Sequence, residues 1–387
     1  MSITRDTDWE QIHFKDATIV DWHVHPSLKV FLFKRMLTAP KGASRAFNPL
    51  SFRSDFEKLR TGGLDVLLST VYAPEREIIQ DCRYLQVLRY LMPGTYRKIY
   101  ERDYFAVTSE MLDQMEAQVK LGVKDGKRQA QMAKSVQELD EILAQGDDRP
   151  IAVIHNIEGA HSLDASLENL KKLFERGVAY ITLAHFYKNP VVHPVFPYPE
   201  TMQKMGCFEY GGDPTLGLTE FGEQVVEAMT EMGMLIDVSH CTPSARERIY
   251  QIVGKQRPLI ATHVGAYEIN PSTYNLKDWE IKKIAESGGM VGVIFMNYWL
   301  MPHETKRGLN FIARTIEHFA DVGGIDHVGF GSDFDGFTDP PDDLKDASEL
   351  PRLTQRLVAE GYPTEAIIKI LGGNALRVLR EGWGRKQ

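Results

Sequence analysis

Short apolar runs rich in β-branched residues alternate along the chain with longer stretches whose apolar residues recur at helical spacing. The short runs predict strands at residues 19–25, 66–72, 151–157, 178–183, 234–238, 259–262, 290–295 and 327–331. The stretches between them predict helices at residues 54–61, 165–175, 220–231, 243–252, 276–286 and 309–319. Eight strands alternating with helices in a chain of 387 residues indicate an α/β fold, the (β/α)8 TIM barrel. A doubly wound open sheet is the alternative, but no Gly-x-Gly-x-x-Gly follows any predicted strand.

One long segment interrupts this alternation after the second predicted strand. Residues 74–147 are interpreted as an almost wholly helical insertion in a single barrel domain that spans residues 1–387. Apolar residues at helical spacing within it, such as Met111, Met115 and Val119, are interpreted as packing positions. The insertion also offers a partner surface, so a homo-oligomer is one expectation.

The composition is that of an ordinary globular protein, with 43% hydrophobic and 25% charged residues. A net charge of -8 without a basic patch argues against binding to nucleic acid or to an anionic membrane surface. No apolar run approaches the length of a membrane span, and residues 1–16 contain no apolar signal segment, so a cytoplasmic protein is expected. Three widely separated cysteines, Cys82, Cys207 and Cys241, predict neither a disulfide framework nor a thiolate zinc site.

Polar residues suited to metal chemistry follow the predicted strands. His23 and His25 are two residues apart, so they point to the same face of the first strand. Five further residues stand at the ends of later strands: Glu158, His185, His240, His263 and Asp333. In a TIM barrel the carboxyl ends of the strands meet at one mouth, so these side chains are expected to converge. A single histidine is more often structural, whereas this joint placement favours a metal site.

Longer motifs surround these residues. They are Asp-Trp-His at 21–23, Leu-Arg-Thr-Gly-Gly at 59–63, Ile-Glu-Gly-Ala-His-Ser at 157–162, Ile-Thr-Leu-Ala-His at 181–185, Asp-Val-Ser-His at 237–240, Thr-His at 262–263, His-Val-Gly-Phe-Gly-Ser-Asp-Phe-Asp-Gly at 327–336 and Leu-Gly-Gly-Asn-Ala-Leu-Arg-Val at 371–378. Taken together, they resemble the membrane dipeptidases, also called renal dipeptidases, of the amidohydrolase superfamily. The resemblance covers nearly the whole chain.

The resemblance implies a metal-dependent hydrolase with two zinc ions per chain, acting on a dipeptide or a related small amide. Glu158 matches the carboxylate that bridges the ions, and His23 matches a ligand of the first ion, with His25 beside it. His240 and His263 match the ligands of the second ion. His185 resembles the residue that holds the scissile carbonyl of the substrate, and Asp333 resembles the acid/base group.

Two positions depart from that family. The dipeptidases usually carry His-x-Asp on the first strand, whereas this chain has His23 and His25, so a neutral imidazole replaces an anionic carboxylate. The family also has an arginine, eleven residues after the strand-six histidine, that grips the carboxylate of the substrate. Counting eleven residues from His263 gives Tyr274, which is therefore the expected substrate-binding residue. Because a tyrosine offers one donor and no charge, the substrate is expected to bind without a carboxylate clamp.

Two other functions fit the same residues. A mononuclear amidohydrolase, such as a deaminase or lactonase, could be built on His23, His25, His240 and Asp333. A relative that keeps the barrel without hydrolysis is the other alternative, although the intact set of converging ligands argues against it. Metal stoichiometry separates the first two functions, because two ions per chain favour the dipeptidase-like enzyme.

Overall fold

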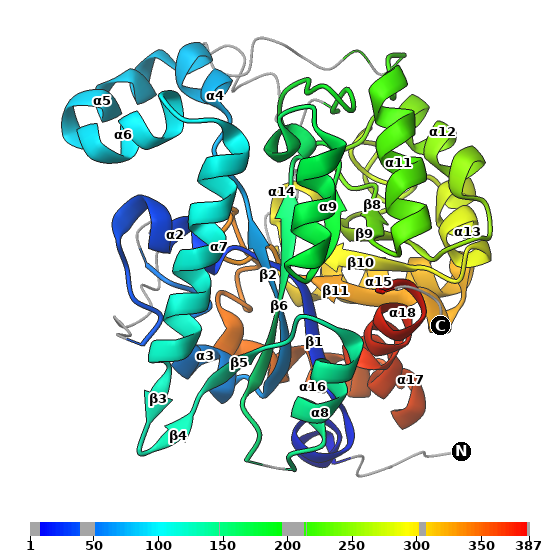
Figure 1. Ribbon diagram of the computed structural model, residues 1–387. Coiled ribbons are helices and arrows are strands. Elements are labelled where there is room, and N and C mark those ends of the chain that lie inside the picture. Colours follow the sequence, from blue (N-terminus) through cyan, green and yellow to red (C-terminus); the bar gives the residue numbers. More distant parts are fainter. Residues whose placement is uncertain are drawn as a thin grey trace.

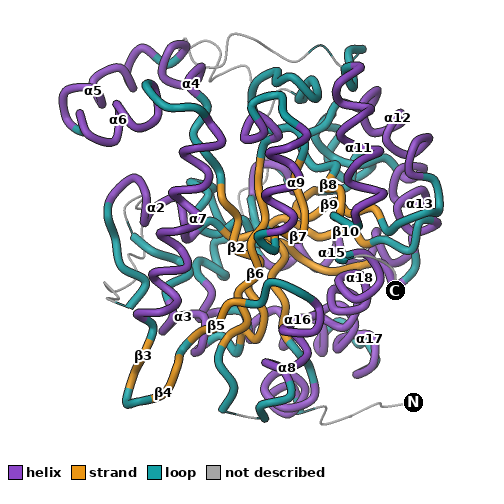
Figure 2. Tube along the Cα trace, in the orientation of Figure 1, coloured by secondary structure: helices purple, strands orange, loops and turns teal. Residues whose placement is uncertain are grey.

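The computed structural model describes residues 8–38, 51–146, 148–195, 213, 215–301 and 307–384. Eight parallel strands form a sheet that curls nearly into a closed barrel, with helices around its outside (Figures 1 and 2). The strands are β1 (Ile19–Val24), β2 (Leu64–Val71), β6 (Ile151–Glu158), β7 (Val178–Thr182), β8 (Leu235–Asp237), β9 (Leu259–Val264), β10 (Met290–Ile294) and β11 (Val328–Gly331). They pair in chain order, and a parallel bridge between Val24 and Phe334 links the end of β1 to the segment after β11. The predicted TIM barrel is confirmed.

The strands appear in the sequence as apolar runs because they are buried on both faces. Every residue of β1 and β6 is buried, as expected for parallel strands between a barrel core and a layer of helices. The six helices predicted between the strands are confirmed. Four begin at a side chain that accepts a backbone N–H of the first turn, namely Asp55, Ser166, Thr219 and Thr242. Each cap fixes the residue at which the loop ends and the helix begins.

The helices outside the insertion cover the barrel and its ends. The α-helices are α1 (Trp9–Gln11), α2 (Pro26–Phe33), α3 (Phe56–Thr61), α9 (Leu167–Glu175), α11 (Glu220–Met232), α12 (Pro243–Val253), α13 (Asp278–Glu286), α14 (Asn297–Leu300), α15 (Leu309–Gly323), α16 (Pro351–Ala359), α17 (Thr364–Ile368) and α18 (Asn374–Gly382). Shorter 3-10 and π turns are η1 (Ile12–Asp16), η3 (Ala160–Leu163), η4 (Ile325–His327), η5 (Ala347–Glu349) and η6 (Lys369–Gly373). The terminal helix α18 packs against β1, β10 and β11.

The segment between β2 and β6 is less uniformly helical than expected. Its helices are α4 (Arg76–Asp81), η2 (Arg83–Val87), α5 (Leu88–Leu91), α6 (Pro93–Tyr100), α7 (Tyr104–Leu121) and α8 (Val136–Leu143). Between α7 and α8 lie a hairpin of β3 (Val123–Lys124) and β4 (Lys127–Arg128), and a strand β5 (Ala130–Met132) that pairs in parallel with β6. The Asp125-Gly126 turn, with both residues at positive φ, explains the hairpin, because such a pair favours tight turns between strands.

The α4–α6 part of this segment stands out from the barrel, at the upper left of Figure 1. The long helix α7 returns from it along the barrel wall, and Met111, Met115 and Val119 are buried there, so their predicted packing role is confirmed. The lobe formed by α4–α6 therefore rises beside the carboxyl ends of the strands.

The cysteines differ from the sequence interpretation. Cys82 is disulfide-bonded and Cys241 is buried and free, while Cys207 lies outside the described residues. The sequence could not reveal this bond, because pairing depends on approach in space and not on spacing along the chain. Among the helices of the described residues, none combines the length and apolar character that crossing a membrane requires. The cytoplasmic location and the homo-oligomer stay predictions.

Candidate metal centre

The first two histidines stand at the end of β1. His23 belongs to the strand and His25 immediately precedes α2, whose first residue is Pro26. Because side chains of a strand alternate, both rings turn to the same side, and their Nε2 atoms lie 3.0 Å apart. Proline at the first helical position starts α2 directly after the pair, since its missing N–H has no partner to lose there. Both side chains are buried.

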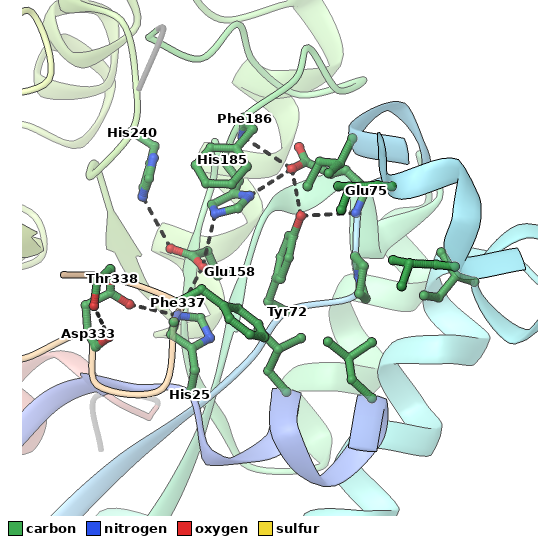
Figure 3. Close-up of a pocket in the computed structure, with 18 of the residues that line it drawn as sticks. His25, Tyr72, Glu75, Glu158, His185, Phe186, His240, Asp333, Phe337 and Thr338 are labelled. Carbon is green, nitrogen blue, oxygen red and sulfur yellow. Dashed lines mark hydrogen bonds and ion pairs between the residues drawn. The ribbon is translucent and has the colours of Figure 1, made fainter. Parts of the chain in front are cut away.

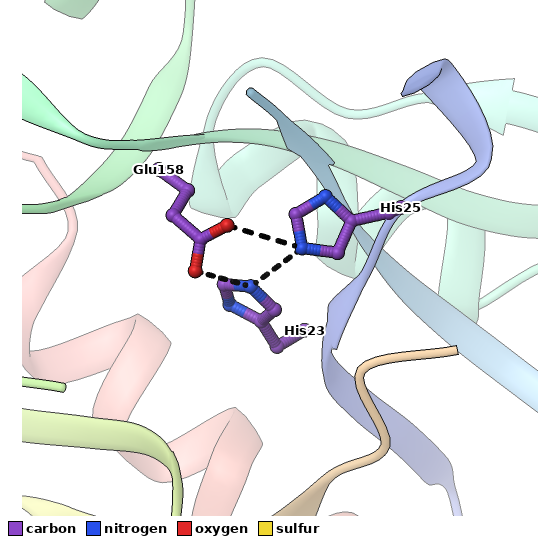
Figure 4. A group of neighbouring side chains, drawn as sticks. All are labelled: His23, His25 and Glu158. Atoms are coloured by element: carbon purple, nitrogen blue, oxygen red, sulfur yellow. Dashed lines mark hydrogen bonds and ion pairs between the residues drawn. The ribbon is translucent and has the colours of Figure 1, made fainter. Parts of the chain in front are cut away.

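Glu158, the last residue of β6, lies at the centre of the site. Its Oε2 atom is 3.3 Å from Nε2 of His25, and its Oε1 atom is 3.3 Å from Nε2 of His23 (Figure 4). Oε1 is also 3.4 Å from Nε2 of His240 and 3.3 Å from Nε2 of His263. One carboxylate therefore contacts two pairs of imidazoles, of which one stands at the end of β1 and the other at the ends of β8 and β9.

The second pair of histidines comes from neighbouring strands. His240 follows β8 and His263 lies in β9, and their Nε2 atoms are 3.0 Å apart. The backbone of His240 has a φ of 63°, a left-handed conformation that is strained for a non-glycine residue. Such strain is typical of functional positions, where the surrounding structure holds a side chain in one direction.

The donor set fits metal ions. His23, His25 and Glu158 form one group, and Glu158, His240 and His263 form another, each with its ligand atoms within 4.8 Å of one another. Four ligands placed tetrahedrally at zinc distances would lie about 3.3 Å from one another, close to the separations observed here. Burial lowers the pKa values of His23 and His240 to about 4, which keeps both imidazoles neutral as metal ligation requires.

His25 differs in its electrostatics. Burial opposes its charge, but the carboxylates of Glu158 and Asp333 outweigh burial and raise the pKa of His25 to about 10. The imidazole therefore holds a proton at neutral pH. A metal ion that bound at this position would have to displace that proton.

A buried hydrogen-bond network fixes the tautomers of His23 and His263. Thr262 donates its single hydroxyl proton to Asp237 at 2.6 Å, so its oxygen accepts from Nδ1–H of His263 at 2.7 Å. The Tyr180 hydroxyl donates to the carbonyl of Trp22, so it accepts from Nδ1–H of His23 at 3.1 Å. In its neutral form each ring then presents an unprotonated Nε2 to the centre of the site.

Asp237 is the anchor of this network. Its carboxylate also accepts from the hydroxyl of Thr182 at 2.6 Å and from the backbone N–H and hydroxyl of Ser239 at 3.0 and 2.8 Å. These bonds let it position His263 through Thr262, and Asp237 also forms a third possible metal-holding group with His23 and His263. The sequence analysis did not identify it, although a carboxylate within the Asp-Val-Ser-His motif was a usable signal.

His185, which follows β7, is held by a second carboxylate. Its Nε2 atom lies 3.5 Å from Glu158 and its Nδ1 atom lies 2.8 Å from Glu75. Glu75 is buried and also accepts from the Tyr72 hydroxyl at 3.0 Å and from the backbone of Tyr187 at 3.0 Å. Burial opposes its charge, yet the neighbouring His185 lowers the pKa of Glu75, so this carboxylate is ionised. Glu75 was also missed from the sequence.

Substitution of Glu75 tests its role in positioning His185. We expect Glu75→Gln to lower kcat about ten- to a hundredfold, the usual effect of weakening a carboxylate that orients a functional histidine. The metal content and KM should stay close to wild type, because Glu75 contacts neither predicted metal group. Steady-state kinetics and metal analysis check this, and an unchanged kcat would show that His185 needs no anchor.

Asp333 follows β11 and faces the first pair of histidines. Its Oδ1 atom is 3.2 Å from Nε2 of His25, and its backbone has a left-handed φ of 56°. Burial opposes its charge, but the hydrogen bond from His25 lowers the pKa of Asp333, so it is ionised. Nearby, the buried Asp335 accepts from Lys29 at 2.6 Å and from the backbone of Ser54 at 3.0 Å, which ties this loop to α2 and to the start of α3.

Tyr274 does not occupy the position expected for a substrate-binding residue. Its hydroxyl donates to the backbone carbonyl of His263 at 2.6 Å, and its ring stacks on Trp299 with the centroids 3.8 Å apart. The side chain is fully buried behind His240, so it supports the second pair of histidines from outside the cavity. A count along the sequence could not show that the loop turns this residue inward.

A cavity of about 400 Å³ opens onto the metal centre (Figure 3). His25, Glu158, His185, His240 and Asp333 line one side of it. Among the described residues that line it, none is an arginine or a lysine. Among the described residues, five of the predicted site residues thus share a lining that lacks the lysine or arginine suited to a substrate carboxylate.

Comparisons with known proteins agree with this description. The model of the membrane dipeptidases (peptidase family M19) matches residues 11–383. An uncharacterised protein encoded in the pqqA 5′ region of Klebsiella pneumoniae is 34% identical over 245 residues, which cover 61% of this chain and 84% of the relative. An uncharacterised dipeptidase of Schizosaccharomyces pombe is 30% identical over 244 residues, which cover 62% of this chain and 56% of the relative.

A solved structure shares the fold. The metallopeptidase from Rhodobacter sphaeroides, crystallised with a phosphinate mimic of the dipeptide L-Ala-D-Ala, has a TM-score of 0.74 at 23% identity, and the match covers 95% of this chain and 99% of that one. The barrel, the histidine–carboxylate cluster and the family match define a metallohydrolase. The chain belongs to the membrane dipeptidase family, as its motifs had suggested.

Proposed function

We propose that this protein hydrolyses a dipeptide or a related small amide at the histidine–carboxylate centre. The observation that carries the proposal is the position of Glu158, whose two oxygens lie within 3.5 Å of five imidazole nitrogens. A buried carboxylate surrounded by five imidazole nitrogens suits a cation-binding site, because imidazole nitrogens and carboxylate oxygens are ligands that transition-metal ions prefer.

The proposed cofactor is zinc, with two ions per chain. His23, His25 and Glu158 would hold one ion, and Glu158, His240 and His263 would hold the other. When bound, zinc supplies Lewis acidity and lowers the pKa of water to near neutrality. The two tautomer-fixing contacts of His23 and His263 support this assignment, because they leave Nε2 of each ring free to ligate.

Two further residues would act on the substrate itself. Asp333 is ionised and lines the cavity, so it can take the proton of the attacking water and return it to the leaving amine. His185 gives Nδ1–H to Glu75, and in its protonated form it presents Nε2–H to the carbonyl oxygen of the scissile amide. The active site would thus combine one proton carrier with one positioned hydrogen-bond donor.

Metal analysis followed by a substrate panel tests the proposal. Protein purified without added metal is expected to contain two zinc ions per chain and to hydrolyse amides in preference to lactones. One ion per chain together with lactone or deaminase activity would instead support the mononuclear enzyme, for which the 3.2 Å contact between Asp333 and His25 is the favouring observation. No turnover of any class by metal-loaded protein would support the non-hydrolytic relative.

The lining of the cavity predicts a weak preference between a substrate with a free C-terminal carboxylate and one with a C-terminal amide. We expect wild-type protein to show less than about a threefold preference for a free dipeptide over its C-terminal amide, since a bidentate arginine contact worth about 1.4 kcal/mol would give tenfold. Lys277 and Arg314, which follow Tyr274 in the sequence and are the candidates for a substitute cation, do not line the cavity, and Arg314 is exposed on α15. Kinetics on matched acid and amide pairs check this, and a strong preference for free acids would reveal a cation that reaches the substrate.

A further inference from the structure

The side of the cavity opposite the metal centre is formed by apolar side chains. They come from α2, from α4–α6 and from the turn between α5 and α6, and they are Leu28, Leu32, Phe33, Ile78, Leu85, Leu88, Met92 and Ile99. In Figure 3 the polar residues lie together on one side, and unlabelled apolar side chains face them from the helices on the other. The lobe that rises beside the barrel in Figure 1 thus supplies five of these eight side chains.

The apolar wall begins next to the residues proposed to act on the substrate. Tyr72, Phe186 and Phe337 lie between the two sides of the cavity, and Phe337 is held there with a left-handed φ of 62°. The ring of Phe337 meets that of Phe33 edge-on, with the centroids 6.3 Å apart. A substrate whose amide lies against Glu158 therefore extends its neighbouring group directly onto apolar surface.

We propose that the substrate carries a large apolar group on one side of the scissile amide, seated between α2 and α4–α6. This inference rests on the proposed function and names the substrate class for the same site. Its physical basis is that an apolar wall gains nothing from a small polar dipeptide, whereas each methylene buried against it raises the affinity about fourfold. A cavity of about 400 Å³ is large enough for such a group, because small-molecule sites start at about 300 Å³.

A second cleft shares part of this wall. Leu32, Phe33 and Met92 also line this more open cleft of about 600 Å³, which carries Lys34 and Arg35. A group longer than the first cavity would have to pass between α2 and the start of α6 to reach it. An acyl chain and a bulky amino acid side chain share the required chemistry, and they differ in whether they can reach this cleft.

Two series of substrates without a C-terminal carboxylate distinguish an acyl chain from an apolar amino acid side chain. One series is alaninamide carrying an acetyl, hexanoyl or decanoyl group, and the other is Gly-, Leu- and Phe-alaninamide, all assayed with zinc-loaded protein. We expect kcat/KM to rise at least about thirtyfold from acetyl to hexanoyl. A further rise to decanoyl identifies an acyl chain, and a rise confined to the Leu and Phe substrates identifies an apolar side chain. No rise in either series overturns the inference.

Two variants of α5 provide a matched comparison. Leu88→Asp places a charge in the apolar wall, whereas Leu91→Asp places the same charge on the same helix at a side chain that is 71% exposed. The readout is the ratio of kcat/KM for the decanoyl and acetyl substrates within each protein, so a general loss of activity cancels. We expect this ratio to fall at least about tenfold in Leu88→Asp and to stay at the wild-type value in Leu91→Asp. Equal ratios in all three proteins would overturn the inference.

Direct binding separates a failure of this inference from a failure of the proposed function. If zinc-loaded wild type hydrolyses none of the amides, the proposed function is wrong, and calorimetry with decanoyl- and acetyl-alaninamide still tests the apolar wall. Tighter binding of the decanoyl compound, lost in Leu88→Asp and kept in Leu91→Asp, would support the apolar site. Equal affinities, or no binding of either compound, would overturn it.

Discussion

Replacing Glu158 with glutamine is expected to lower kcat/KM by more than about a thousandfold and to reduce the zinc content of the purified protein. The carboxylate contacts both histidine pairs, so it is placed to neutralise charge on both of the proposed ions. An amide supplies one neutral oxygen and an N–H that repels a cation. Without bound metal the pKa of the attacking water has its ordinary, very high value, which accounts for the expected loss of kcat/KM. Steady-state kinetics and elemental analysis of the same preparation measure both effects.

The control for this substitution is Glu141→Gln, which makes the same chemical change at an exposed position of α8. It should keep wild-type zinc content and turnover. Glu158 would lose its proposed role if the glutamine variant kept full metal occupancy and undiminished turnover. A variant that lost zinc but retained activity would point to chemistry that does not depend on the metal.

The Asp333→Asn variant is expected to keep its metal and to lose about two to four orders of magnitude in kcat. Asparagine preserves the shape of the side chain but cannot accept and return a proton, and that range is the usual contribution of a positioned acid/base group. Asp333 lines the cavity and reaches His25, whereas its carboxylate is absent from both predicted metal groups. Metal content should therefore change much less than turnover.

Asp321→Asn on the exposed face of α15 is the matched control and should leave kcat and zinc content unchanged. If loss of metal proved to be the main effect of Asp333→Asn, then Asp333 would be a ligand, and the mononuclear arrangement with His23, His25 and His240 would be favoured. Metal titration of both variants, followed by kinetics at saturating zinc, separates lost binding from lost proton transfer.

The strands with the polar residues at their ends, and the long-range contacts of the site, depend on the sequence to different degrees. Strand ends and strand-end chemistry are local, because an apolar run and the His-x-His spacing of His23 and His25 are fixed by a few consecutive residues. The barrel then follows from counting strands, and the convergence of Glu158 and His263 follows from the barrel. The hairpin at Asp125-Gly126 is also local, because the residue types of its turn are visible in the sequence.

By itself, therefore, the sequence determined the barrel, the family and the set of residues that meet at its mouth. Only the tertiary structure decided which partners hold them, because those contacts join segments that are far apart in the chain. Glu75, in the insertion, accepts a hydrogen bond from His185, which follows β7. Thr262 links Asp237 to His263 inside the sheet. The inward turn of Tyr274 and the apolar wall of α2 and α4–α6 arise in the same way. Periodicity reports how a segment folds locally, whereas the closure of the barrel determines which side chains share a buried space.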